Sequence, residues 1–178
     1  MTKTKGYRGK APTLEERAII REATTEALRQ RARAGTWAYP GLYACNALST
    51  TIISDHPKLF YVTLAALSLL AGIRVWILDS FEHRERASWL WYFRANALAL
   101  AATWSIFVSA VLLYYGNQWE GIFALLLTSG IGAGATTSLS PRKELARIYL
   151  AILLVPPTAA AIVASSLASA SICIIYLG

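Results

Sequence analysis

The stretch from Trp119 to Tyr149, WEGIFALLLTSGIGAGATTSLSPRKELARIY, decides the fold. It starts with an aromatic residue suited to a membrane interface, and no charged residue follows between Gly121 and Pro141. A short Ser-Pro turn then leads into the basic sequence RKELAR at residues 142–147. This pattern predicts a membrane-spanning helix, a corner at the membrane surface and the start of the next helix.

The middle of this predicted span, residues 129–138, consists almost entirely of small side chains. A helix that faces lipid would carry Leu, Ile and Phe there. Small residues four positions apart, such as Gly130 and Gly134, let a neighbouring backbone approach closely. We therefore expect Gly130, Gly132 and Gly134 to be helix-packing positions, with this span at the centre of a bundle. The GIGAG run lacks the Gly-Lys-Ser/Thr ending of a phosphate-binding loop, which favours packing over phosphate binding.

The composition of the whole chain is typical of a membrane protein. Of its 178 residues, 56% are hydrophobic and only 15% are charged, whereas soluble domains have about 25% charged residues. Apolar runs long enough to cross a bilayer as helices recur along the chain. The expected fold is an all-α membrane protein, with roughly five to six transmembrane helices in a bundle after a cytoplasmic juxtamembrane helix.

The chain divides into three segments. Residues 1–12 form a basic tail that we expect to be disordered, and residues 13–34 form the juxtamembrane helix. An interfacial or dimer-contacting role for this helix stays open, although its apolar stripe is thin. The transmembrane domain, residues 35–178, has predicted spans at about 36–53, 59–78, 89–115, 119–139, 145–163 and 168–178, the last one truncated.

The apolar stretch from Leu145 to Gly178 is too long for one span and short for two. Pro156-Pro157 interrupts the helical hydrogen-bond ladder and predicts a kink. We expect a turn at Ser165-Ser166 to separate a fifth span from a sixth, and one kinked helix is the alternative.

The positive charges predict the orientation in the membrane. All but one of the 17 Lys and Arg residues lie in the N-terminal segment, near the loop after residue 78, or after Pro141. Lys58 is the exception. The positive-inside rule therefore puts the N-terminus in the cytoplasm. We expect the protein to lie in the cell inner membrane as a multi-pass protein. The same rule explains the net charge of +7, so we expect no nucleic-acid partner.

The sequence contains no recognisable catalytic, cofactor or metal site. Its two cysteines, Cys45 and Cys173, lie in apolar runs, and its two histidines lie in predicted loops without further ligands nearby. No acidic residue lies deep in a predicted span, which disfavours a proton- or cation-coupled transporter. We therefore predict a protein that is not an enzyme.

A few charged and polar side chains within the predicted spans are the candidate site residues. Arg74 and Arg94 lie in apolar runs, where a charge is costly and often functional, but both can also snorkel to the cytoplasmic interface. Asp79 or Glu82 is a candidate partner for either arginine. Other polar side chains either line a small pocket or form hydrogen bonds between helices. They are Asn46, Asn96, Trp104 and Thr136.

Several motifs follow one another in a recognisable order. They are WAYP at residues 37–40, the arginine near the end of the second span, W-x-W-Y-F-R at residues 89–94, S-P-R at residues 140–142 after a small-residue span, and a proline-interrupted fifth span. This order resembles the MASE-like multi-pass membrane sensory modules at the N-terminus of some bacterial sensor histidine kinases and diguanylate cyclases. In such proteins a catalytic output domain follows the module.

The resemblance implies a non-catalytic sensory input module for signal transduction of the two-component type. It would form a homodimer in the lipid bilayer and pass a signal through its last helix to a C-terminal kinase or cyclase domain outside this chain. The alternative is a structural or accessory subunit of a larger membrane complex. A coiled-coil linker and an output domain encoded after Gly178 would favour the first function, and a stop codon the second.

The charge asymmetry predicts which loops face the cytoplasm. A topology reporter fused at Asp55 or Asn117 is expected to read as periplasmic, and one at Glu85 or Arg142 as cytoplasmic. Paired alkaline phosphatase and green fluorescent protein fusions measure this directly. A cytoplasmic signal at Asn117 would overturn the predicted order of spans.

Overall fold

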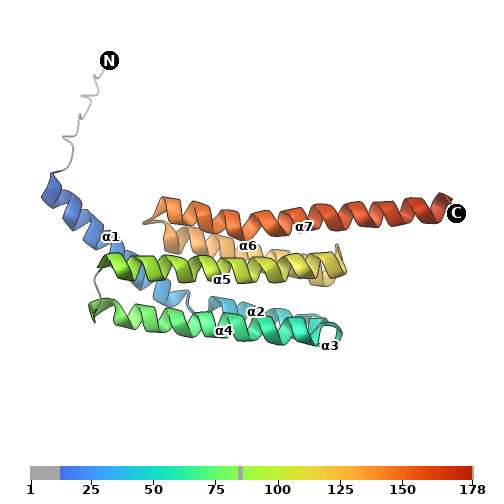
Figure 1. The fold of residues 1–178 in the computed structure, drawn as a ribbon, viewed down its shortest axis with the longest axis horizontal. Helices are drawn as coiled ribbons and strands as arrows, with labels where there is room; N and C mark the ends of the chain where they lie inside the picture. Colours follow the sequence, from blue (N-terminus) through green and yellow to red (C-terminus); the bar gives the residue numbers. More distant parts are fainter. Residues whose placement is uncertain (1–12, 84–85, 178) are drawn as a thin grey trace, which may run out of the picture.

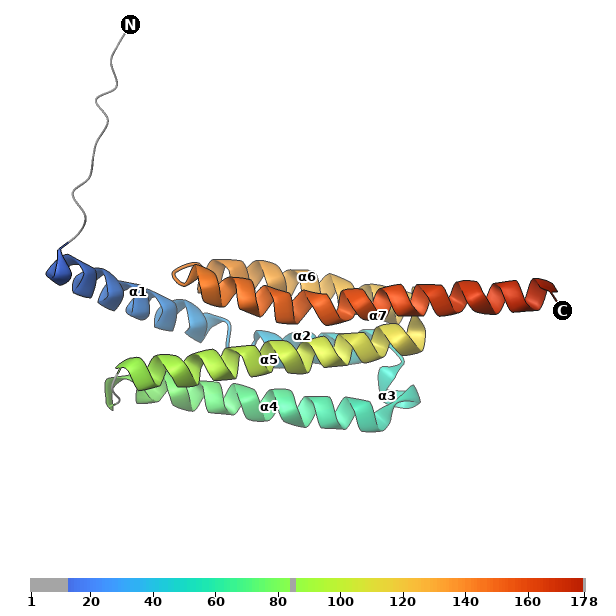
Figure 2. The same cartoon turned by 45° about the horizontal axis from the view of Figure 1, so that its top comes forward.

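The computed structural model describes residues 13–83 and 86–177, so the basic tail of residues 1–12 lies outside the described residues. Every regular element in the described ranges is a helix, which confirms the expected all-α bundle (Figures 1 and 2). The elements are α1 (Leu14–Ala34), α2 (Ala38–Ser49), α3 (Ile52–Asp55), α4 (Pro57–Asp79), the 3-10 helix η1 (Ser80–His83), α5 (Arg86–Tyr115), α6 (Trp119–Leu139) and α7 (Lys143–Leu177).

Four of the described helices are long and apolar enough to cross a membrane, namely α4, α5, α6 and the Lys143–Ser165 part of α7. This count is lower than the five to six expected. The predicted first span, 36–53, is two short helices, because Thr50 adopts an extended conformation with φ −136° and ψ 166°. The 12 residues of α2 extend only about 18 Å at 1.5 Å per residue, well short of a bilayer core of about 30 Å.

Side-chain hydrogen bonds satisfy backbone carbonyl groups at the break between α2 and α3. The Thr50 hydroxyl donates a hydrogen bond to the carbonyl oxygen of Asn46 at 2.7 Å. The indole Nε1 of Trp119, at the start of α6, donates to the carbonyl oxygen of Ser49 at 2.9 Å. Carbonyls that leave a helix in an apolar environment need such partners, so the break is stabilised by another helix.

The last helix is continuous. α7 runs for 35 residues through Pro156 and Pro157 and through the expected Ser165-Ser166 turn, so the sixth span is not a separate helix. Hydroxyl side chains bond back to the helix instead of ending it: Thr158 Oγ1 donates to the Leu154 carbonyl at 2.8 Å. Such bonds let Ser and Thr continue a helix. The end of α7 projects beyond the other helices, at the end of the bundle opposite α1 (Figure 1).

The helix at the centre of the bundle is α5, and the central position expected for the small-residue helix α6 was wrong. α5 contacts α4, α6 and α7, and 50% of its apolar stretch is buried, against 33% for α6. Large side chains make more dispersion contacts than small ones, so they mark the centre. The buried row on α5 is Trp89, Phe93, Leu100, Trp104, Phe107 and Val111.

An aromatic cluster joins α2 to this row. The Tyr43 ring from α2 meets Phe107 edge to face, with ring centroids 4.9 Å apart, and stacks on Phe60 of α4 at 5.4 Å. The indole Nε1 of Trp104 donates to the hydroxyl of Thr128 on α6 at 2.9 Å. These contacts hold α2, α4 and α6 around α5, since aromatic pairs add to the packing energy.

The glycines of α6 differ in their surroundings. A Cβ atom at Gly132 would lie 3.7 Å from Leu150 and 3.9 Å from Leu153 of α7, which is ordinary packing contact. At Gly130 and Gly134 a Cβ atom would meet nothing within 4 Å in the described chain. Close packing onto α7 is therefore observed at Gly132, and the other two glycines face outward.

This difference predicts opposite outcomes for one substitution at two positions. Gly132→Leu is expected to destabilise the chain by about 1–3 kcal/mol, because the larger side chain forces α7 away from α6. Gly134→Leu is expected to melt close to the parent protein. Thermal unfolding in a nonionic detergent, followed by circular dichroism, compares the two, and equal losses of stability would contradict the assignment.

Candidate functional site

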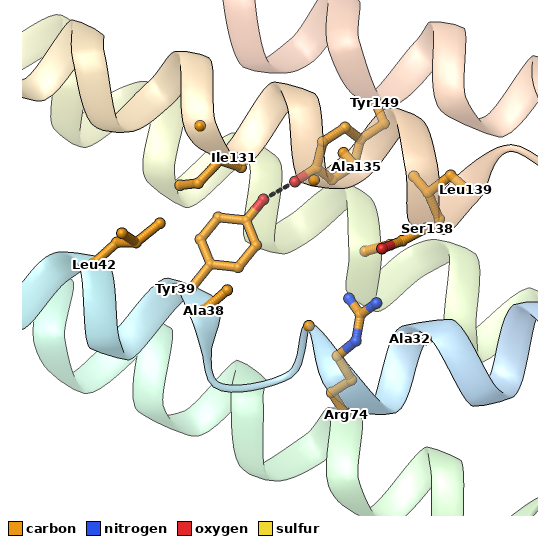
Figure 3. A pocket seen from close by; sticks show the side chains of 14 residues that line it. Ala32, Ala38, Tyr39, Leu42, Arg74, Ile131, Ala135, Ser138, Leu139 and Tyr149 are labelled. Carbon is orange, nitrogen blue, oxygen red and sulfur yellow. Dashed lines mark hydrogen bonds between the residues drawn. The ribbon is translucent and has the colours of Figure 1, made fainter.

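A cavity of about 120 Å³ lies where the α1–α2 junction meets α4, α6 and the start of α7 (Figure 3). Engineered cavities of about 150 Å³ bind benzene, so there is room for a small chemical group. The polar lining side chains come from Tyr39, Arg74, Ser138 and Tyr149. The remaining lining residues are Ala32, Gly35, Ala38, Leu42, Ala97, Gly130, Ile131, Gly134, Ala135 and Leu139. Apolar walls therefore surround a single charged group.

That charged group is Arg74, which is only 8% exposed. Its guanidinium carbon lies 4.9 Å from the centre of the Phe93 ring, and its Nε atom has no hydrogen-bond partner in the described chain. In Figure 3 the guanidinium rises from α4 into the space between α1 and α6, toward Ser138. A buried cation is costly unless it is paired and hydrogen-bonded, and none of the described residues that line this cavity is acidic.

The two predicted interface arginines have different environments. Arg94 is exposed, as expected for a side chain at an interface. Asp79, one candidate partner of Arg74, instead approaches Arg33 of α1 at 3.7 Å. The side chain of Glu82, the other candidate partner, lies outside the described residues.

Two tyrosines from opposite ends of the chain form one wall of the cavity. The hydroxyls of Tyr39, on α2, and Tyr149, on α7, form a hydrogen bond (Figure 3), and both residues are buried. Trp104 packs edge-on against Tyr39, with ring centroids 5.9 Å apart. The pair therefore ties the start of α2 to α7 beside Arg74.

Helix α1 is attached to the bundle next to the same cavity. Arg31 Nη1 donates to the Ser140 hydroxyl at 2.6 Å and to the Thr137 carbonyl at 3.2 Å. Ala32 and Gly35, at the end of α1, line the cavity itself. The cavity is therefore bounded in part by the end of α1 and the residue that follows it.

Two predicted polar residues make hydrogen bonds between helices. Asn96 Nδ2, on α5, donates to the Leu70 carbonyl of α4 at 2.9 Å, and Trp104 bonds to Thr128 of α6. The sequence left two alternatives for Asn96 and Trp104, a pocket lining or a hydrogen bond between helices, and the structure shows the hydrogen bond.

The other two predicted residues lie apart. Asn46 is buried on α2 with its Nδ2 atom unpartnered. Thr136 is exposed and donates to the Ala133 carbonyl of its own helix at 2.7 Å. None of the four proposed pocket residues lines the cavity beside Arg74.

The tyrosine pair had no recognisable signal in the sequence. Tyr39 and Tyr149 are 110 positions apart, and each resembles an ordinary interface aromatic. Arg74 did carry a signal, since an arginine inside an apolar run is rare. Only the fold brings the three side chains together.

The opposite end of the bundle is held by polar and aromatic contacts. His56 stacks on Tyr114 with ring centroids 4.1 Å apart. Asp55 accepts hydrogen bonds from Thr51 at 2.7 Å and Tyr115 at 2.9 Å, and these bonds hold the pKa of the Asp55 carboxyl below its usual value. In the described ranges, no group of three or more His, Cys, Asp and Glu side chains is placed to hold a metal ion.

The tyrosine hydrogen bond is open to a double-mutant test. Tyr39→Phe and Tyr149→Phe are each expected to cost about 1–3 kcal/mol, because each leaves a buried hydroxyl without its partner. The double variant is expected to be no less stable than either single variant. Chemical unfolding of all four proteins measures the coupling, and strictly additive losses would contradict the bond.

A scan against protein-family models and searches of curated proteins and of solved structures found no match for this chain.

Proposed function

We propose that this chain is a membrane-embedded sensory module of a bacterial signal-transduction protein, which binds a ligand in the Arg74 cavity and is not itself an enzyme. The observation that carries the proposal is the buried Arg74 cation: its Nε atom has no hydrogen-bond partner among the described residues, and the described residues that line the adjoining cavity include no acidic side chain. Intramembrane charges of this kind often mark binding sites. The ordered motifs that resemble MASE-like sensory modules point the same way.

In this proposal α1 carries the signal. The cavity is shared between the bundle and the α1–α2 junction, so a bound ligand changes the packing of Ala32 and Gly35. The bonds from Arg31 to Ser140 and Thr137 hold α1 in one arrangement, which such a change can bias. Binding is thereby converted into a movement of α1.

The proposed orientation puts the α1 end of the bundle in the cytoplasm of a cell with an inner membrane. The support is the positive charge at that end, on α1 and after the α6–α7 turn. The end of α7 lies at the opposite end of the bundle (Figure 1). A kinase or cyclase domain joined to the end of α7 would reach the cytoplasm only if the chain crossed the membrane once more. In this orientation α1 already lies on the cytoplasmic side. Homodimerisation remains part of the proposal.

The coupling can be tested without knowing the ligand. Ala135 lines the cavity, so Ala135→Phe fills it from within. Spin labels at Gln30 on α1 and Lys143 on α7, in a background without Cys45 and Cys173, report the position of α1 by double electron–electron resonance. We expect Ala135→Phe to shift the mean distance by on the order of 2 Å or more.

The matched control is Ala133→Phe, an exposed position on the same helix outside the cavity. Its distance distribution is expected to equal that of the parent protein, and circular dichroism verifies that both variants are folded. Identical distributions in all three folded proteins would contradict a sensory role for the cavity.

A further inference from the structure

We propose that the ligand is a single-chain amphiphile, with a carboxylate head paired to Arg74 and an apolar tail lying along α6. This proposal rests on the proposed function for its biological role, but its chemistry follows from the cavity alone. Three observations carry it: Arg74 as the single cation among the described lining residues, none of which is acidic, the small volume around that cation, and the side on which the cavity opens.

The head group follows from charge and size. Among the described residues, Arg74 is the one charged side chain that lines the cavity, and a guanidinium pairs with one carboxylate through two parallel hydrogen bonds. A phosphate carries up to two negative charges, for which the described lining residues supply no second cation. The volume of about 120 Å³ suits a carboxylate and the first few methylene groups, given that a cavity of about 150 Å³ accommodates a benzene molecule.

The apolar tail is inferred from the side on which the cavity is open. Ala38, Gly130 and Gly134 line the cavity and are also exposed, so the cavity reaches the surface of the bundle between α2 and α6. Nothing within 4 Å would meet a Cβ atom at either glycine. In a bilayer this surface faces acyl chains, so an apolar tail can extend out of the cavity into lipid.

The order of residues along α6 gives the tail its direction. Ser138 lies beside the guanidinium near the end of α6 (Figure 3). By their sequence positions, Gly134 and Gly130 lie one and two turns further from that end, and both line the cavity. From Ser138 to Gly130 the helix rises about 12 Å. The head therefore lies near the membrane surface and the tail points toward the bilayer centre, as in an amphiphile dissolved in one leaflet.

Direct binding of tritiated hexadecanoate to the purified full chain in a nonionic detergent tests the proposal by scintillation proximity. Saturable binding is expected, with competition by unlabelled hexadecanoate. Hexadecanol, which has the same tail without the charge, is expected to compete at least tenfold more weakly. Acetate, which has the head without the tail, is expected not to compete.

Two pairs of variants locate the site. Arg74→Gln is expected to weaken binding at least tenfold, whereas Arg94→Gln, at an exposed arginine on the neighbouring helix, leaves binding unchanged. Gly134→Leu, which blocks the open side, is expected to weaken binding, and Ala133→Leu is its control. Melting curves verify that each variant is folded.

Several outcomes would overturn the proposal. Competition by acetate as strong as by hexadecanoate would assign the site to a free small carboxylate, and stronger competition by hexadecyl phosphate would assign it to a phosphate head. Undiminished binding to folded Arg74→Gln would remove the head-group assignment. If Ala135→Phe moves α1 but hexadecanoate does not bind, the sensory role is supported and the proposed ligand class is wrong. If hexadecanoate binds but does not change the spin-label distance to α1, the proposed ligand class is supported and the sensory role is wrong.

Discussion

The row of large side chains on α5 is the constraint on which the rest of the structure depends. Trp104 and its neighbours on α5 hold α2, α4 and α6 at distances set by aromatic rings. Around the α1–α2 junction several of the lining positions are Gly, Ala or Ser, among them Gly35, Ala38, Gly134 and Ser138. Such small side chains leave space between the helices, and the cavity occupies that space.

Arg74 gives this cavity its chemical character. An arginine within a membrane helix costs about 3 kcal/mol on insertion scales, and the face of a Phe ring returns about 0.5–2 kcal/mol. An exposed position like that of Arg94 avoids the cost by reaching water. Arg74 cannot do so at 8% exposure. An anion that brings its own apolar surface compensates the charge and fills the volume at once.

Long apolar runs predicted the core helices well, because length and composition are local properties. The predicted span 119–139 coincides with α6, and 59–78 lies within α4. The break after α2 was missed, since the partner of the Ser49 carbonyl is Trp119, a residue distant in sequence. Arg74 was recognised from its apolar surroundings, but the Tyr39–Tyr149 pair depends on how α2 and α7 pack. The small residues of α6 predicted close packing between helices. Gly132 packs on α7, whereas Gly130 and Gly134 line the cavity.

The junction between α1 and α2 is held by few backbone hydrogen bonds of good length. Its backbone bonds are long, with Thr36 N to Arg33 O at 3.4 Å and Ala38 N to Gly35 O at 3.3 Å, near the upper limit for such bonds. The Thr36 hydroxyl closes α1 by donating to the Ala32 carbonyl at 3.1 Å. Segments with weak backbone bonds open more readily than packed helices. Ala32, Gly35 and Ala38 of this junction line the cavity, so a ligand in the cavity would contact a segment whose backbone hydrogen bonds are long. In the proposed function, ligand binding would therefore act on α1 without requiring the packed core around α5 to change.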